Sequence, residues 1–175
     1  MKILALSGSL RAGSINSATL RAAARLAAPG IEVQVYGALG ELPLFNPDRE
    51  ADSPMSVLAL QRAVSAADGL LIASPEYAHG VSGTIKNALD WLVGFAPFAG
   101  KRVAVLNTSP RSWYADAALR ETLRTMAAII VEPASIAVPL LGSRLDEDGM
   151  IADAAVAGAL RAALSALRSA IATHR

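Results

Sequence analysis

The sequence has 175 residues, a length typical of one domain. Lys and Arg number 16 against 15 Asp and Glu, and a net charge of +1 gives no support for a nucleic-acid groove or a polybasic membrane surface. Cysteine is absent, which excludes disulfide scaffolds, zinc–thiolate sites, iron–sulfur clusters and thiol catalysis. Charged residues make up only 18% of the chain, so we expect another subunit to cover part of the surface.

The first residues do not form a secretory signal, because Gly8 and Ser9 interrupt the apolar run that follows Lys2. No stretch is expected to reach the roughly 18–20 apolar residues of a membrane span. We therefore expect a cytoplasmic protein with no membrane span.

Strand, loop and helix alternate five times along the chain. Short apolar runs predict buried strands at 2–7, 69–74 and 102–106. The segment 31–36 alternates in polarity, as an edge strand does, and 134–138 is the fifth strand candidate.

Helices are predicted in the segments between the strands and after the last one. Ser53 is expected to cap the second helix, with Pro54 in its first turn. The irregular segment 37–52 is expected to run over the surface. The five predicted helices are 16–28, 53–67, 83–93, 116–128 and a last one from about residue 153.

This alternation predicts an α/β protein, a flavodoxin-like three-layer α/β/α sandwich with a five-stranded parallel sheet in the order 2-1-3-4-5. We expect residues 1–175 to form a single domain. In such sheets ligands bind at the carboxyl ends of the strands, where the strand order reverses. The loops that follow Ser7, Ser74 and Asn107 are therefore the candidate site.

The first loop, 7–17, leads directly into a helix. Ser9, Ser14, Asn16 and Arg11 supply donors around a helix N-terminus, which carries about half a positive charge. This pattern predicts a phosphate-monoester site. The loop lacks the Lys-Ser/Thr pair of an ATPase P-loop and the G-x-G-x-x-G dinucleotide fingerprint. The alternative is an ordinary strand-to-helix turn, with Ser14 or Asn16 as the helix cap.

The second loop, 74–91, suits a flat heterocycle. Pro75 fixes one backbone torsion and Gly80 frees another, so the main chain can bend closely round a ring. Tyr77 offers an aromatic face or edge. Lys86 is expected to be solvated rather than catalytic.

The third loop, 107–116, places Ser109 within reach of a ligand edge. Arg111, Trp113 and Tyr114 either line the mouth of the site or belong to a solvated loop with one packed aromatic ring. Between the second and third loops, the apolar cluster around Trp91, Phe95 and Phe98 is either part of the core or an association surface. Leu92 is expected in the core.

The motif GSLRAGSIN after the first strand, together with PEYAHGVSGTIKNALDW after the third, closely resembles the NADPH-dependent FMN reductase family over roughly residues 1–138. Members are flavodoxin-like flavoproteins that reduce FMN, quinones, azo dyes or chromate. The resemblance implies FMN as cofactor and NADPH or NADH as co-substrate. It also implies small-molecule electron acceptors as partners and a homodimer or homotetramer.

The resemblance further implies which residues hold the cofactor. The FMN phosphate would be bound by Ser9, Arg11, Ser14 and Asn16, and the isoalloxazine ring would be bordered by Pro75, Glu76, Tyr77, Ala78, His79 and Ser109. It implies no metal and no catalytic side chain, because the flavin carries the chemistry. His79 is the candidate proton donor to a quinone.

Three positions depart from the family pattern. Ala78 stands where Asn or another polar residue is frequent, Ser82 where Pro is common, and 112–114 where relatives often carry paired glycines. These departures concern acceptor preference and the placement of the flavin. The physiological acceptor, the choice between NADH and NADPH, and dimer against tetramer stay open.

The expected function is an FMN-dependent NAD(P)H oxidoreductase that passes hydride to flavin, quinone, azo-dye or metal-oxyanion acceptors by a ping-pong mechanism. The alternative is a non-enzymatic flavodoxin-like electron carrier or FMN-binding module, but flavodoxins usually carry an acidic surface. A serine hydrolase is disfavoured, because Gly80–Thr84 breaks the G-x-S-x-G elbow and only His79 and His174 are available for a triad.

Overall fold

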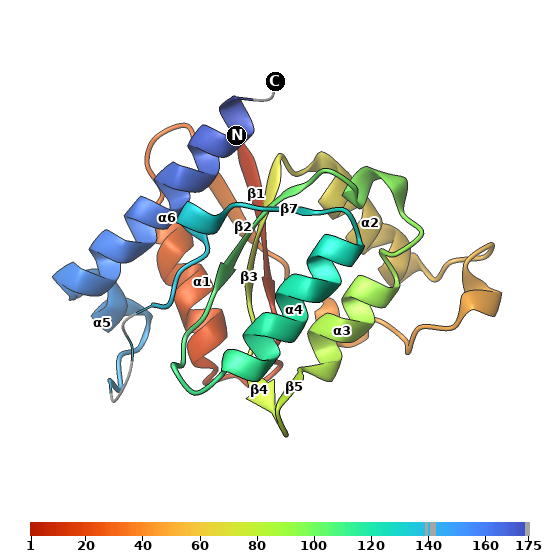
Figure 1. Cartoon of the computed structure of the whole chain (residues 1–175), viewed down its shortest axis with the longest axis horizontal. Coiled ribbons are helices and arrows are strands. Elements are labelled where there is room, and N and C mark those ends of the chain that lie inside the picture. The colour runs from red at the N-terminus through yellow and green to blue at the C-terminus, as the bar shows by residue number, and fades with distance from the viewer. Residues whose placement is uncertain (139, 141–142, 174–175) are drawn as a thin grey trace.

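The computed structural model describes residues 1–138, 140 and 143–173, so His174 lies outside the described residues. A parallel sheet runs through the middle of the molecule with helices on both faces (Figure 1). Its strands are β1 (Lys2–Ser7), β2 (Glu32–Val35), β3 (Gly69–Ala73), β6 (Arg102–Leu106) and β7 (Ile129–Ile130). They follow the order β2-β1-β3-β6-β7, and every neighbouring pair is parallel. The predicted order 2-1-3-4-5 is confirmed.

Two apolar layers hold the sandwich together, because successive side chains of a strand point to opposite faces. In β1, Ile3 and Ala5 pack beneath two helices, α1 (Ile15–Leu26) and α6 (Ala154–Ala172). Leu4 and Leu6 face the other layer, formed by α2 (Met55–Ala66), α3 (Gly83–Asp90) and α4 (Trp113–Thr125). A short helix, α5 (Glu147–Ala152), precedes α6 and packs on α1.

The remaining elements are short. They are the hairpin strands β4 (Glu76–Tyr77) and β5 (Gly80–Val81) and the 3₁₀ turns Leu39–Glu41, Pro47–Arg49, Ala96–Phe98 and Glu132–Ala134.

The fifth strand is not where the sequence predicts it. It is β7, and the predicted segment 134–138 contributes only one isolated parallel bridge, between Ala137 and Asn107. Pro133 sits in the 3₁₀ turn Glu132–Ala134, where its missing N–H and fixed φ favour a turn over a continued strand. The sheet edge is therefore divided between β7 and this bridge.

Helix boundaries also differ from the predictions. α4 begins at Trp113, three residues early, and α3 ends at Asp90. Pro54, not Ser53, occupies the cap position of α2, because the Ser53 hydroxyl instead donates to the Glu50 carbonyl at 2.9 Å.

The apolar cluster behind the second loop is core. Trp91, Leu92 and Phe98 are buried, and the indole Nε1 of Trp91 donates to the Pro43 carbonyl at 2.8 Å. Phe95 is partly buried against the same layer. This cluster is therefore no association surface.

Helix α6 corrects the expectation that no segment approaches the length of a membrane span. It is long and apolar enough to cross a membrane by length and composition alone. Its buried face, which includes Val156, Leu160, Leu164 and Leu167, packs in the core layer on the α1 side of the sheet.

Candidate functional site

The three predicted loops meet at one end of the sheet, where the N-terminal ends of α1, α3 and α4 and the β4–β5 hairpin lie together (Figure 1). The first loop lies against the end of β3, where the second loop begins, because the Gly8 N–H donates to the Ala73 carbonyl at 2.8 Å. The first loop joins the third through Asn16, whose Oδ1 accepts from the Thr108 hydroxyl at 2.9 Å. The predicted convergence is therefore observed.

Gly8 allows the first two loops to touch. A Cβ at Gly8 would lie 2.2 Å from the Ser74 Oγ and 2.7 Å from the Ser82 Oγ. These two hydroxyls are themselves 3.2 Å apart and hydrogen bonded. Only a residue without a side chain fits between them.

Hydroxyl groups fix the shape of the first loop. The Ser7 and Ser17 Oγ atoms lie 2.8 Å apart, and the Ser7 Oγ accepts from the Ser9 N–H at 3.3 Å. The Ser14 Oγ accepts from the Ser17 N–H at 3.3 Å, which makes Ser14 the N-cap of α1, as one reading of the sequence holds. Ser14 and Asn16 are both buried, so both position the loop.

The same loop leaves several donors free. Among the described residues, the backbone N–H groups of Ala12, Gly13 and Ile15 have no hydrogen-bond partner, and Arg11 makes no ion pair. Arg11 is exposed. Free amides and a guanidinium at the N-terminus of a twelve-residue helix are the donor set that a phosphate dianion needs. The loop therefore fits the phosphate of FMN.

A hollow of about 720 Å³ adjoins this loop and is bordered by residues 11–15 and 143–148. Arg21 and Arg25 of α1 also line this hollow. Both form ion pairs with Glu147 across it, at 2.8 Å from Arg21 and 3.1 Å from Arg25. The hydrogen bond from Arg21 lowers the pKa of the Glu147 carboxyl. A second hollow of about 230 Å³ lies toward Tyr36, and Arg11 lines both.

The second loop is a β-hairpin, which the sequence analysis missed. Its two turn residues have left-handed backbone, with φ of 48° at Ala78 and 59° at His79. Two-residue hairpin turns of type I′ need positive φ at both positions and favour Asn and Gly there. Positive φ explains why a residue such as Asn suits position 78. The two turn signals of this loop, Pro75 and Gly80, lie before and after the turn rather than in it.

Glu76 anchors the hairpin to α4. Its Oε2 accepts from the Ala115 N–H, in the first turn of α4, at 2.8 Å. Ser112, the cap residue of that helix, makes no side-chain cap hydrogen bond, so the Glu76 carboxylate takes over this role. Pro75 beside it is partly buried, and Tyr77 is exposed.

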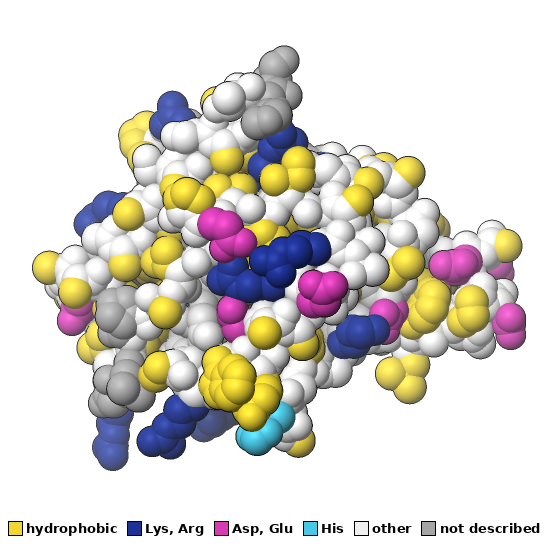
Figure 2. All heavy atoms as spheres, in the orientation of Figure 1, with side chains coloured by type: hydrophobic (Ala, Val, Ile, Leu, Met, Phe, Trp, Pro, Cys, Tyr) yellow, Lys and Arg dark blue, Asp and Glu magenta, His cyan; other side chains and the backbone are white. Residues whose placement is uncertain are grey.

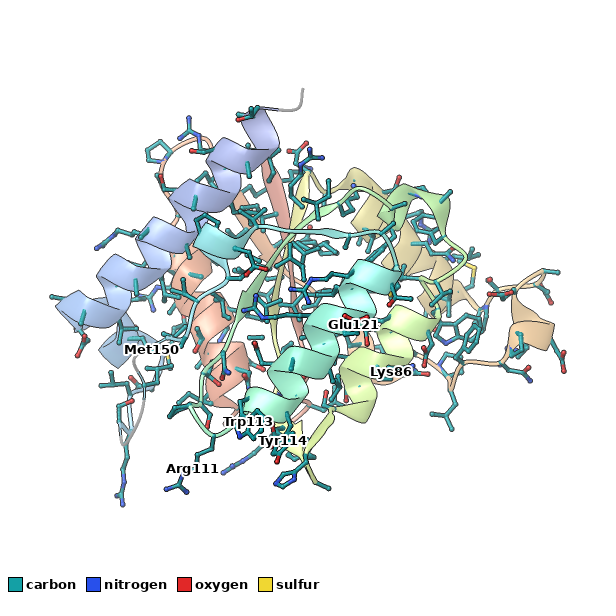
Figure 3. The ribbon with its side chains drawn as sticks, viewed as in Figure 1. Lys86, Arg111, Trp113, Tyr114, Glu121 and Met150 are labelled. Atoms are coloured by element: carbon teal, nitrogen blue, oxygen red, sulfur yellow. The ribbon has the colours of Figure 1, made fainter. Side chains whose placement is uncertain are left out.

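The third loop continues directly from β6. The Asn107 Oδ1 accepts from the Ser109 N–H at 2.9 Å, and the Ser109 Oγ accepts from the Arg111 N–H at 3.3 Å. These bonds hold the partly buried Ser109 at the carboxyl edge of the sheet. Arg111 is exposed and extends away from the body of the molecule (Figure 3).

Three aromatic rings stack where the second and third loops meet. The ring centroids of Trp113 and Tyr114 lie 3.7 Å apart, and those of Tyr114 and His79 lie 4.5 Å apart. We call these three residues the ring stack. Figure 2 shows its hydrophobic patch beside a histidine, and Figure 3 shows Trp113 and Tyr114 at the start of α4. Both rings are exposed, so neither is the packed aromatic that one sequence interpretation allows.

A doubly wound sheet whose first loop offers donors that fit a phosphate is typical of a flavodoxin-like flavoprotein. Residues 1–140 match the family of NADPH-dependent FMN reductases, and the chain belongs to this family. It is 38% identical over 136 residues to an NAD(P)H-dependent FMN reductase of Pseudomonas aeruginosa, across 76% of this chain and 73% of that protein. It is 32% identical over 157 residues to a 2-hydroxy-1,4-benzoquinone reductase of a Burkholderia species, across 86% and 85%.

Among solved structures, the chain is similar to FerB, a flavoenzyme NAD(P)H:(acceptor) oxidoreductase from Paracoccus denitrificans. The TM-score is 0.81 at 29% identity, over 99% of this chain and 98% of FerB. The predicted family, the oxidoreductase class, FMN and the nicotinamide co-substrate are thereby confirmed. The protein is an FMN-dependent NAD(P)H oxidoreductase.

Proposed function

We propose that this enzyme passes electrons from NAD(P)H to quinones and other small acceptors, which occupy one flavin face in turn with the nicotinamide. The observation that carries the proposal is a set of N–H groups and the Arg11 side chain at the α1 N-terminus, none of which has a partner among the described residues. Gly8 brings their loop close to Ser74 and Ser82, which flank the hairpin. The quinone reductase among its relatives supports the acceptor class. Residues 1–175 act as one FMN-binding domain in this proposal.

Each loop has a distinct task in this proposal. Arg11 and Ser9 bind the FMN phosphate directly, while Ser14 and Asn16 hold the helix N-terminus in place. The ring is bordered by the hairpin and the third loop, through Pro75, Glu76, Tyr77, Ala78, His79 and Ser109. Bound FMN supplies the hydride chemistry. The nearby N-termini of α1, α3 and α4 favour negative charge at this edge.

Steady-state kinetics test the shared face. With NADPH and a benzoquinone varied together, double-reciprocal plots are expected to give parallel lines, because the oxidised nicotinamide leaves before the acceptor binds. Adding NADP⁺ should inhibit competitively against the quinone. Intersecting lines would mean that both substrates bind at once and would overturn the shared face.

His79 is the proposed proton donor to the reduced quinone. A quinone takes up two electrons and two protons, so a hydride equivalent leaves one proton to be supplied by a side chain or by water. We expect His79→Gln to lower quinone turnover, because an imidazole can donate a proton and the amide side chain of glutamine cannot. The measurement is kcat against pH with one quinone. If the variant and the wild type give the same kcat at every pH, His79 is not the proton donor.

The enzyme is proposed to be a homodimer or homotetramer. The low charged fraction and three large apolar side chains on the surface, Leu44, Met55 and Val93, support association. Light scattering of the purified protein is expected to give a mass two or four times 18.1 kDa. A monomer at micromolar concentration would contradict this.

A further inference from the structure

We propose that the ring stack of Trp113, Tyr114 and His79 is a docking platform that selects planar conjugated ring acceptors over acceptors without a ring. The inference rests on the proposed function, since it assigns acceptor choice at the same site. Its occupant is a planar conjugated ring of the quinone class.

The geometry of the stack leaves ring faces open at its ends. Tyr114 lies in the middle, inclined by 28° to Trp113 and by 18° to His79. Trp113 is 60% exposed and Tyr114 41%, and His79 is also exposed. Near-parallel rings at these centroid distances are in stacking contact, and an added flat ring extends such a stack in the same way.

The ring stack lies at the proposed flavin site, because its residues come from two of the loops that form that site. His79 comes from the hairpin that is proposed to border the isoalloxazine ring, and Trp113 and Tyr114 come from the end of the third loop. The 2.8 Å bond from the Ala115 N–H to Glu76 ties these two segments together within three residues of the stack. A flat acceptor held on these rings is therefore next to the proposed flavin position.

The backbone that carries His79 is held in an unfavourable conformation. Left-handed φ is sterically unfavourable for residues other than glycine, and both Ala78 and His79 adopt it. Strained residues of this kind persist where surrounding contacts hold them, and they gather at ligand clamps. Here that conformation accompanies the stacking of the imidazole on Tyr114.

The ring stack favours a flat acceptor, because a planar conjugated ring can stack on its exposed rings and an acceptor without a ring cannot. Arg111, two residues before Trp113, extends away from the body of the molecule and is not part of the platform (Figure 3). A second copy of this chain is the competing occupant.

The test compares one benzoquinone with ferricyanide, both with NADPH. Trp113→Leu and Tyr114→Leu keep apolar bulk but remove a ring; Trp113→Phe and Tyr114→Phe keep a ring. We expect each leucine variant to lower the quinone-to-ferricyanide ratio of kcat/KM about 2- to 13-fold, the value of one aromatic contact of about 0.5–1.5 kcal/mol. The phenylalanine variants should keep the ratio within about 2-fold.

Three outcomes are informative. A lowered ratio in the leucine variants with an unchanged mass by light scattering supports the platform. An unchanged ratio overturns it, and so does a reduced mass in those variants, which assigns the rings to a subunit contact. Failure of the wild-type enzyme to reduce either acceptor refutes the proposed function instead, so the two failures are distinguishable.

Discussion

Arg11→Ala is expected to weaken FMN binding about 10- to 150-fold, because a charge-assisted hydrogen bond contributes about 1.5–3 kcal/mol. Arg11 is exposed and makes no ion pair within the described part of the chain, so its removal leaves no buried partner unsatisfied. The fold should therefore keep its stability. The measurement is a titration of apoprotein with FMN, followed by the quenching of flavin fluorescence.

Two variants make this result specific. Arg124→Ala removes an exposed arginine whose ion pair with Glu132, at 3.4 Å, lies near the far end of α4, and it should leave FMN affinity unchanged. Arg11→Lys keeps the charge but loses the planar fork of donors, so an intermediate affinity is expected. Equal affinity in wild type and Arg11→Ala would refute the assignment of the phosphate to this loop.

Gly8→Ala is expected to damage both stability and cofactor binding. The new methyl group would lie 2.2 Å from the Ser74 Oγ, so the first and second loops must move apart. Overpacking of this kind costs about 1–3 kcal/mol in the free energy of unfolding. The separation also displaces the two loops that hold the phosphate and the ring, so FMN affinity should fall. Chemical denaturation and the same FMN titration measure the two effects.

Gly158→Ala is the matched control for this substitution. A Cβ at Gly158, inside α6, meets no atom within 4 Å, and alanine favours a helix interior by about 0.5–1 kcal/mol. Stability should therefore rise slightly, with FMN affinity unchanged. If Gly8→Ala unfolds at the wild-type denaturant concentration and binds FMN equally well, the close contact between the two loops contributes neither to stability nor to cofactor binding.

The sheet was predictable where strands are buried on both faces. The bounds of β1 and β6 agree with the predicted 2–7 and 102–106, because continuous apolar runs mark interior parallel strands. The edge was not predictable, since β7 is two residues long. It depends on tertiary pairing, such as the bond from the Ile129 N–H to the Lys101 carbonyl at 2.8 Å.

The site was predictable in position but not in its internal contacts. Parallel topology requires the loops after β1, β3 and β6 to meet, and they do. The partners of Asn16 and Glu76 lie 92 and 39 residues away along the chain, so no local pattern reveals them. The hairpin was missed because its turn consists of Ala78 and His79, neither of which is a strong turn residue.

The most direct test of the central claim is an absorbance spectrum of the purified protein, before and after anaerobic addition of NADPH. Flavin bands near about 375 and 450 nm are expected, and NADPH alone should bleach them. Bands that persist would indicate an electron carrier that needs a partner reductase. No bands, even after incubation with FMN, would contradict the account, because the first loop would then serve another ligand.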